Sequence, residues 1–159
     1  MLQNSAGPEP SKLNSTPIPP APPALAAHVT VKVEPDNEDK RGIRTWSYKL
    51  FNDEPSGSPQ HITSFVLEVA APVTVTGTPA GWSVVTDGES NVLWYCSEQQ
   101  PPYSNDIAPG TSLAGFEIQT SEHKSRHAPF GLMAWDHKAN HAGGVTLDSV
   151  RSPGRKTKD

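Results

Sequence analysis

The sequence predicts an all-β protein, a sandwich of two antiparallel sheets with about eight or nine strands. Apolar and polar residues alternate with a two-residue period in many short segments between residues 28 and 150. Turn-forming residues separate these segments roughly every ten residues, and no segment shows the apolar stripe of a helix. A flattened barrel is the leading alternative. The sandwich is preferred because the strands are long for a small barrel and prolines interrupt them where sheet edges are expected.

Composition divides the chain into three parts. Residues 1–27 hold seven of the 17 prolines, with Ser, Asn and Ala between them, and such a segment buries too little apolar surface to become ordered. We expect a disordered, extended leader there, then a β-sandwich domain over residues 28–150 and a basic flexible tail over residues 151–159. Residues 1–9 carry no positive charge and prolines break the apolar segment 18–27, so no signal peptide is recognised.

The first strands are expected at residues 28–34, 45–52 and 62–70, each bounded by charged or proline-containing turns. In the second segment Trp46, Tyr48 and Leu50 point to one side. Shorter strands are expected at 73–76, 82–86, 91–97, 113–120, 129–136 and 145–150, joined by loops that include 98–112, 121–127 and 137–144. The dipeptide Asp87-Gly88 predicts a hairpin between two of these strands.

Charge and cysteine content exclude several classes of protein. The chain has 13 Lys and Arg against 17 Asp and Glu, a net charge of −4, and no basic stripe that could bind nucleic acid. No apolar run approaches the ~20 residues that span a membrane. The single cysteine, Cys96, allows no intrachain disulfide and is expected to be a small buried side chain.

No catalytic motif stands out, so we expect a protein that is not an enzyme and needs no cofactor. The G-x-S-x-G, G-x-G-x-x-G and P-loop patterns are all absent from the sequence. Four histidines, His123, His127, His137 and His141, lie within about 20 residues of one another. The pairs His123/His127 and His137/His141 lie in the two loops at opposite ends of the expected strand 129–136. Ligands from opposite ends of a strand cannot converge, so we expect exposed loop side chains rather than a metal site. A metal-binding or hydrolytic protein that uses these histidines is the second alternative function.

Aromatic residues supply the candidate ligand contacts. Trp135, Tyr103 and Tyr95 lie in or beside predicted loops and could stack on sugar rings, whereas Trp46 and Trp94 are expected in the core. This makes a carbohydrate-binding module the first alternative. The same side chains could instead face a protein partner.

Several segments resemble bacterial immunoglobulin-like surface domains. The similar stretches are 46–52 (WSYKLFN), 65–69 (FVLEV), 79–82 (PAGW), 87–88 (DG), 92–94 (VLW) and 106–116 (DIAPGTSLAGF). The resemblance implies an immunoglobulin-like or fibronectin-like sandwich in a secreted or cell-envelope protein. The leading expectation is a non-enzymatic interaction or structural domain, with a protein or polysaccharide at a surface as its partner.

Overall fold

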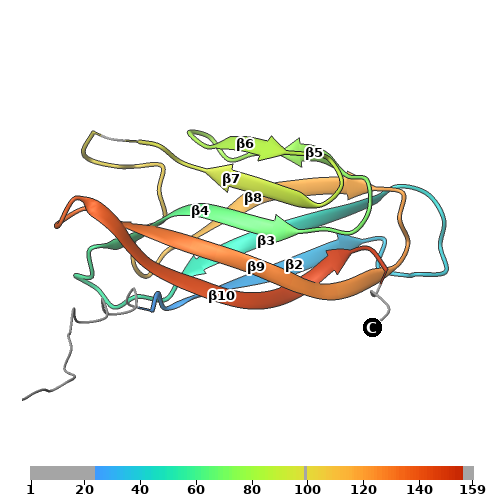
Figure 1. The fold of residues 1–159 in the computed structure, drawn as a ribbon, viewed down its shortest axis with the longest axis horizontal. Helices are drawn as coiled ribbons and strands as arrows, with labels where there is room; N and C mark the ends of the chain where they lie inside the picture. Colours follow the sequence, from blue (N-terminus) through green and yellow to red (C-terminus); the bar gives the residue numbers. More distant parts are fainter. Residues whose placement is uncertain (1–23, 99, 156–159) are drawn as a thin grey trace, which may run out of the picture.

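The computed structural model describes residues 24–98 and 100–155, which form two antiparallel β-sheets packed face to face (Figure 1). The strands are β2 (Ala27–Glu34), β3 (Arg44–Asn52), β4 (Gln60–Glu68), β5 (Thr74–Gly77), β6 (Ser83–Thr86), β7 (Asn91–Tyr95), β8 (Ser112–Thr120), β9 (Ser125–Asp136) and β10 (His141–Pro153). One sheet has the order β10-β9-β4-β7-β6 and the other β2-β3-β8-β5. The predicted sandwich is therefore confirmed, and the flattened barrel is wrong. Within the described ranges, no helix is long and apolar enough to cross a membrane.

The core lies between the two sheets and follows the predicted alternation. Trp46, Tyr48 and Leu50 on β3 are buried, while the residues between them are more accessible. Phe65 and Leu67 on β4 meet them from the facing sheet. A residue at every second position faces the interior because successive side chains of a strand point to opposite faces. Trp94 and Cys96 are also buried, as predicted.

The hairpin predicted at Asp87-Gly88 joins β6 to β7, with Thr86 opposite Val92. Gly88 has a φ of 84°, a conformation that costs little only in glycine. The carboxylate of Asp87 accepts hydrogen bonds from the side chain of Ser90 and from nearby backbone N–H groups, and these bonds lower its pKa.

The folded part extends further than the sequence predicts at both ends. Leu25 is buried and its N–H donates to the carbonyl of Val145, so this residue of the predicted leader packs against the domain. Residues 1–23 of that leader lie outside the described residues. Strand β10 continues to Pro153, where Ser152 is buried and donates to the Glu68 carbonyl. Residues 151–153 therefore belong to the sheet rather than to the tail, because they pair with the start of β9.

Two predicted loops are shorter than expected. Strand β9 already begins at Ser125 and β10 already begins at His141, so residues 125–127 and 141–144 are in strands rather than loops. Residues 125–127 (SRH) are all polar and residues 141–144 (HAGG) include two glycines, so neither stretch shows the apolar–polar alternation that predicts a strand. Pairing across the chain creates the strands here: Pro153 lies opposite Ser125 and His141 opposite Asp136.

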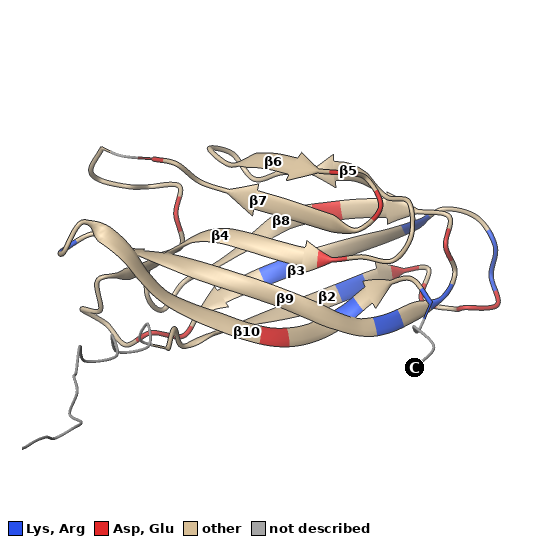
Figure 2. Ribbon diagram, in the orientation of Figure 1, with Lys and Arg blue, Asp and Glu red and all other residues tan. Residues whose placement is uncertain are grey.

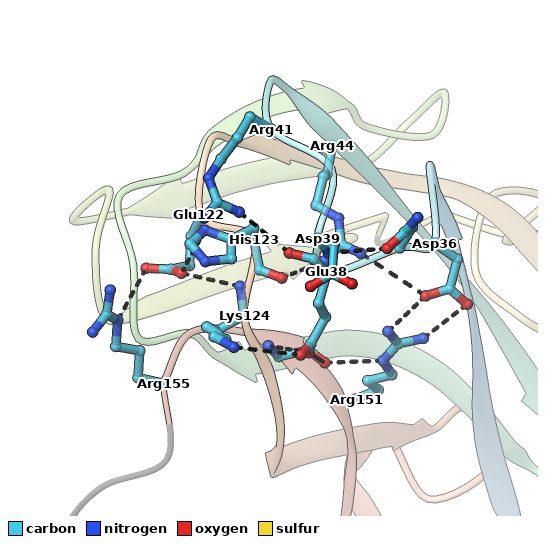
Figure 3. Close-up of polar contacts among 12 residues, drawn as sticks. Asp36, Glu38, Asp39, Arg41, Arg44, Glu122, His123, Lys124, Arg151 and Arg155 are labelled. Atoms are coloured by element: carbon cyan, nitrogen blue, oxygen red, sulfur yellow. Dashed lines mark hydrogen bonds and ion pairs between the residues drawn. The ribbon is translucent and has the colours of Figure 1, made fainter.

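Charged residues gather at the end of the sandwich formed by the β2–β3 and β8–β9 loops (Figure 2). There Arg151 donates to both carboxylate oxygens of Asp36, at 2.7 and 3.1 Å, which lowers the pKa of Asp36 (Figure 3). Arg44 lies behind this pair with its side chain fully buried. Its Nε donates to the carbonyl of Pro35 at 3.0 Å and its Nη1 to that of His123 at 2.9 Å. The buried guanidinium thus joins the β2–β3 loop to the β8–β9 loop.

Candidate functional site

A histidine–aspartate cluster occupies the other end of the sandwich. The Nδ1 of His61 lies 2.9 Å from Oδ1 of Asp106, and the Nε2 of His137 lies 2.6 Å from Oδ2 of the same carboxylate. The two imidazole rings meet edge to face with centroids 4.7 Å apart. Each carboxylate oxygen therefore bonds a different histidine.

The cluster is largely shielded from water. The side chain of Asp106 is 1% exposed, against 22% for His61 and 12% for His137. Among residues 24–98 and 100–155, no lysine or arginine forms an ion pair with Asp106. A buried carboxylate needs paired donors, and here the two imidazoles supply them.

Backbone pairing brings these three residues together from distant parts of the chain. His61 stands near the start of β4, and its neighbour Ile62 exchanges two backbone hydrogen bonds of 3.0 Å with Ile107, the residue after Asp106. His137 follows directly after β9, and its N–H donates to the carbonyl of Pro59 at 3.3 Å. The cluster is thus assembled where β4, β9 and the β7–β8 loop meet.

Asn52, at the end of β3, fastens this meeting point. Its buried side-chain amide donates to the carbonyls of Gln60 at 2.9 Å and Ile107 at 2.8 Å. Its Oδ1 accepts from the N–H of Glu54. One side chain therefore joins the segments that carry His61 and Asp106.

Replacing Asn52 with alanine is expected to lower the free energy of unfolding by about 2–3 kcal/mol, because two carbonyls lose their donor. Urea unfolding followed by tryptophan fluorescence measures the change. Asn91→Ala is the matched control: its exposed side chain predicts a loss of about 0.5 kcal/mol or less. Equal losses in the two variants would show that Asn52 fastens nothing.

A recess of about 550 Å³ opens beside the cluster. Its lining consists of Thr63, Cys96, Ser97, Glu98, Tyr103, Trp135, His137 and Asn140. The ring of Tyr103 stacks on that of His137, with centroids 3.6 Å apart and planes 17° from parallel. The indole of Trp135 remains 37% exposed. The recess thus combines aromatic surface with carboxylate, amide and hydroxyl groups.

The predicted ligand contacts divide into two places. Trp135 and Tyr103 both line the recess, although they come from β9 and from the β7–β8 loop. Tyr95 does not line it. It stands on β7 opposite Ser64 and Ser83, at a position that alternates with the buried Trp94 and therefore faces outward.

The four late histidines lie apart. The carbonyl of His123 belongs to the charged end around Arg44 (Figure 3). His127 lies within β9 opposite Arg151. The Nδ1 of His141 donates to the carbonyl of Ala142. Of the four, His137 is the one that belongs to a group of three potential metal ligands in the described part of the chain.

The sequence reasoning missed His61 and the role of Asp106. Asp106 is separated from His61 by 45 positions and from His137 by 31. No spacing rule links residues so far apart, since their proximity depends on which strands pair. Only knowledge of which strands pair, here β4 with β9 and Ile62 with Ile107, would have predicted that these three residues lie together.

Cys96 is buried at the border of the recess, and burial is the main reason why the pKa of its thiol is raised. A raised pKa keeps the sulfur protonated near neutral pH, which makes it a poor nucleophile and a poor metal ligand.

No protein-family model matches the sequence, and no curated protein matches it either. Among solved structures, a protein from Nocardia farcinica with an immunoglobulin-like fold aligns with a TM-score of 0.55 and 14% identity, covering 81% of this chain and 99% of the other. A cohesin module from a family 33 glycoside hydrolase of Clostridium perfringens aligns with a TM-score of 0.40 and 15% identity, covering 83% of this chain and 100% of the module. AvmM, which catalyzes macrocyclization in alchivemycin A biosynthesis, aligns with a TM-score of 0.37 and 11% identity, covering 85% of this chain and 91% of AvmM. The first of these likenesses shows that the chain has an immunoglobulin-like β-sandwich fold.

Proposed function

We propose that the chain is a non-enzymatic binding domain, and that the recess takes a small polyhydroxyl ligand such as a unit of a polysaccharide. The observation that carries the proposal is the composition of the recess wall. A partly exposed indole offers a flat apolar surface to a sugar face, and Glu98 and Asn140 stand near it to bond hydroxyl groups. Burial raises the pKa of the Cys96 thiol, which disfavours nucleophilic chemistry at this residue.

The test is retention of the protein on soluble polysaccharides in affinity gels, with xylan, laminarin and chitin oligosaccharides as probes. Trp135→Ala is expected to weaken binding about tenfold or more, equivalent to roughly 1.4 kcal/mol. Met133→Ala is the control, because Met133 is exposed on the same face of β9 but does not line the recess. Binding that survives Trp135→Ala unchanged, or no retention on any probe, would contradict the proposal.

A protein partner is the second candidate, favoured by an apolar row across the outer face of the five-stranded sheet. Register places Leu147, Gly131, Val66, Leu93 and Val85 side by side on consecutive strands. Leu147, Val66 and Val85 are exposed, and the strands of this sheet carry few charged residues (Figure 2). Contiguous exposed apolar surface is typical of interaction sites. For a protein partner, Leu147→Glu would abolish binding while Trp135→Ala would leave it intact.

The proposal includes a bacterial cell-surface or secreted setting. Its support is the resemblance of segments such as 46–52 and 106–116 to bacterial surface domains. Fractionation of the cells that produce the protein, with an antibody to the domain, tests the location, and a purely cytosolic signal would contradict it.

A further inference from the structure

We infer that His61, Asp106 and His137 form a binding site for one divalent transition-metal ion, with zinc as the expected occupant. The two imidazoles and the carboxylate each offer one ligand atom, and these atoms all lie within 4.8 Å of one another. This inference does not rest on the proposed ligand of the recess.

The donor set matches the chemistry of such ions. Zinc binds imidazole nitrogen and carboxylate oxygen at about 2.0–2.2 Å, and sites with three protein ligands keep a further position for water or another ligand. Imidazole donors also suit copper, nickel and iron, whereas calcium and magnesium prefer oxygen donors alone. Two histidines with one carboxylate therefore favour a transition metal over the abundant hard cations.

Burial is the second argument. The carboxylate of Asp106 is 1% exposed, and within residues 24–98 and 100–155 its partners are the two histidine nitrogens. Buried charged groups in proteins are usually paired or coordinate a metal. A divalent ion between the three side chains would add a positive charge beside this carboxylate to the contacts that the imidazoles make.

The frame around the cluster holds the ligands in place before any ion arrives. The Ile62–Ile107 hydrogen bonds and the Asn52 amide fix the segments of His61 and Asp106. The stacked ring of Tyr103 restricts the orientation of His137. Such outer contacts orient ligands and raise metal affinity, because less order must be imposed on binding.

A second histidine–aspartate pair provides a contrast within the same molecule. The Nδ1 of His28 lies 2.5 Å from Oδ2 of Asp53, but both side chains are about half exposed. Within the described ranges no third ligand group joins this pair to make a metal cluster. His28 is therefore the matched control for His61 and His137.

The experiment is calorimetric titration of ZnCl₂ into the metal-stripped full chain, carrying no added histidine tag. We expect one zinc per chain and a rise in the unfolding temperature, since an ion that binds the folded state alone stabilises it. The variants His61→Gln and His137→Gln are expected to lose at least 100-fold in affinity, and His28→Gln is expected to bind like the wild type. Wild-type affinity in both site variants, or an equal loss in His28→Gln, would overturn the assignment.

A second measurement on the unaltered protein covers the case in which a site variant does not fold. Addition of CoCl₂ to the metal-stripped chain is expected to produce visible absorption bands that one equivalent of ZnCl₂ abolishes. Absence of both the zinc heat and the cobalt bands would overturn the inference without reference to any variant. Because neither readout involves a sugar, failure here is distinguishable from failure of the recess proposal.

Discussion

Replacing Phe65 with alanine is expected to lower the free energy of unfolding by about 3–5 kcal/mol, enough to unfold a domain of ordinary stability in part. The side chain is fully buried on β4, in the middle of the five-stranded sheet. Its ring stacks on Trp94 with centroids 5.4 Å apart and planes 10° from parallel, and it meets Phe116 edge to face at 5.7 Å. Removing it leaves a cavity between the sheets and strips contacts from both.

Urea unfolding measured by circular dichroism and by tryptophan fluorescence checks this value. Val66→Ala serves as the control, because the neighbouring side chain lies on the outer face and its loss is expected to cost about 1 kcal/mol or less. If Phe65→Ala and Val66→Ala unfolded at the same urea concentration, the packing of the two sheets would not depend on the Phe65 ring.

Replacing Arg44 with alanine is expected to cost about 3–4 kcal/mol, the second large effect. The carbonyls of Pro35 and His123 lose their guanidinium donor, and the space left by a fully buried side chain stays unfilled. The guanidinium carbon also lies 5.9 Å from the centre of the Trp46 ring, so cation–π attraction is lost as well.

Two further variants separate the causes. Arg44→Met restores much of the buried volume but neither the donors nor the charge, so the difference between Met and Ala measures packing. The remaining loss measures the hydrogen bonds and the cation–π contact together. Arg155→Ala is the control for charge alone, because that side chain is mostly exposed and contacts Glu122 at 4.0 Å. Equal denaturation midpoints for Arg44→Ala, Arg44→Met and Arg155→Ala would show that the buried Arg44 side chain contributes nothing to stability.

The elements that could be predicted are those with a local cause. The face of β3 that points into the core could be predicted because Trp46, Tyr48 and Leu50 recur with the two-residue period of a strand. The β6–β7 hairpin could be predicted because Gly88 adopts a backbone conformation that other residues avoid. Both signals act between residues that are close in sequence.

The elements that escaped prediction have partners far away. Arg151 was assigned to a flexible tail, yet it pairs with Asp36 across 115 positions and extends β10 by its pairing with β9. Arg44 lies just outside the expected strand 45–52, although it begins β3 and one of its acceptors lies 79 positions further along the chain. Polar residues in such places carry no apolar pattern that would mark them as ordered.

Residue order was enough to settle the fold class, the inner faces of the strands and the aromatic core, because side-chain period and turn preference operate over a few residues. The candidate site is different. His61, Asp106 and His137 stand together because β4 pairs with β9 and because a bridge at Ile107 pins the β7–β8 loop to β4. Many pairings satisfy the same local preferences, and the choice among them depends on how whole sheets pack, so it became visible in three dimensions alone.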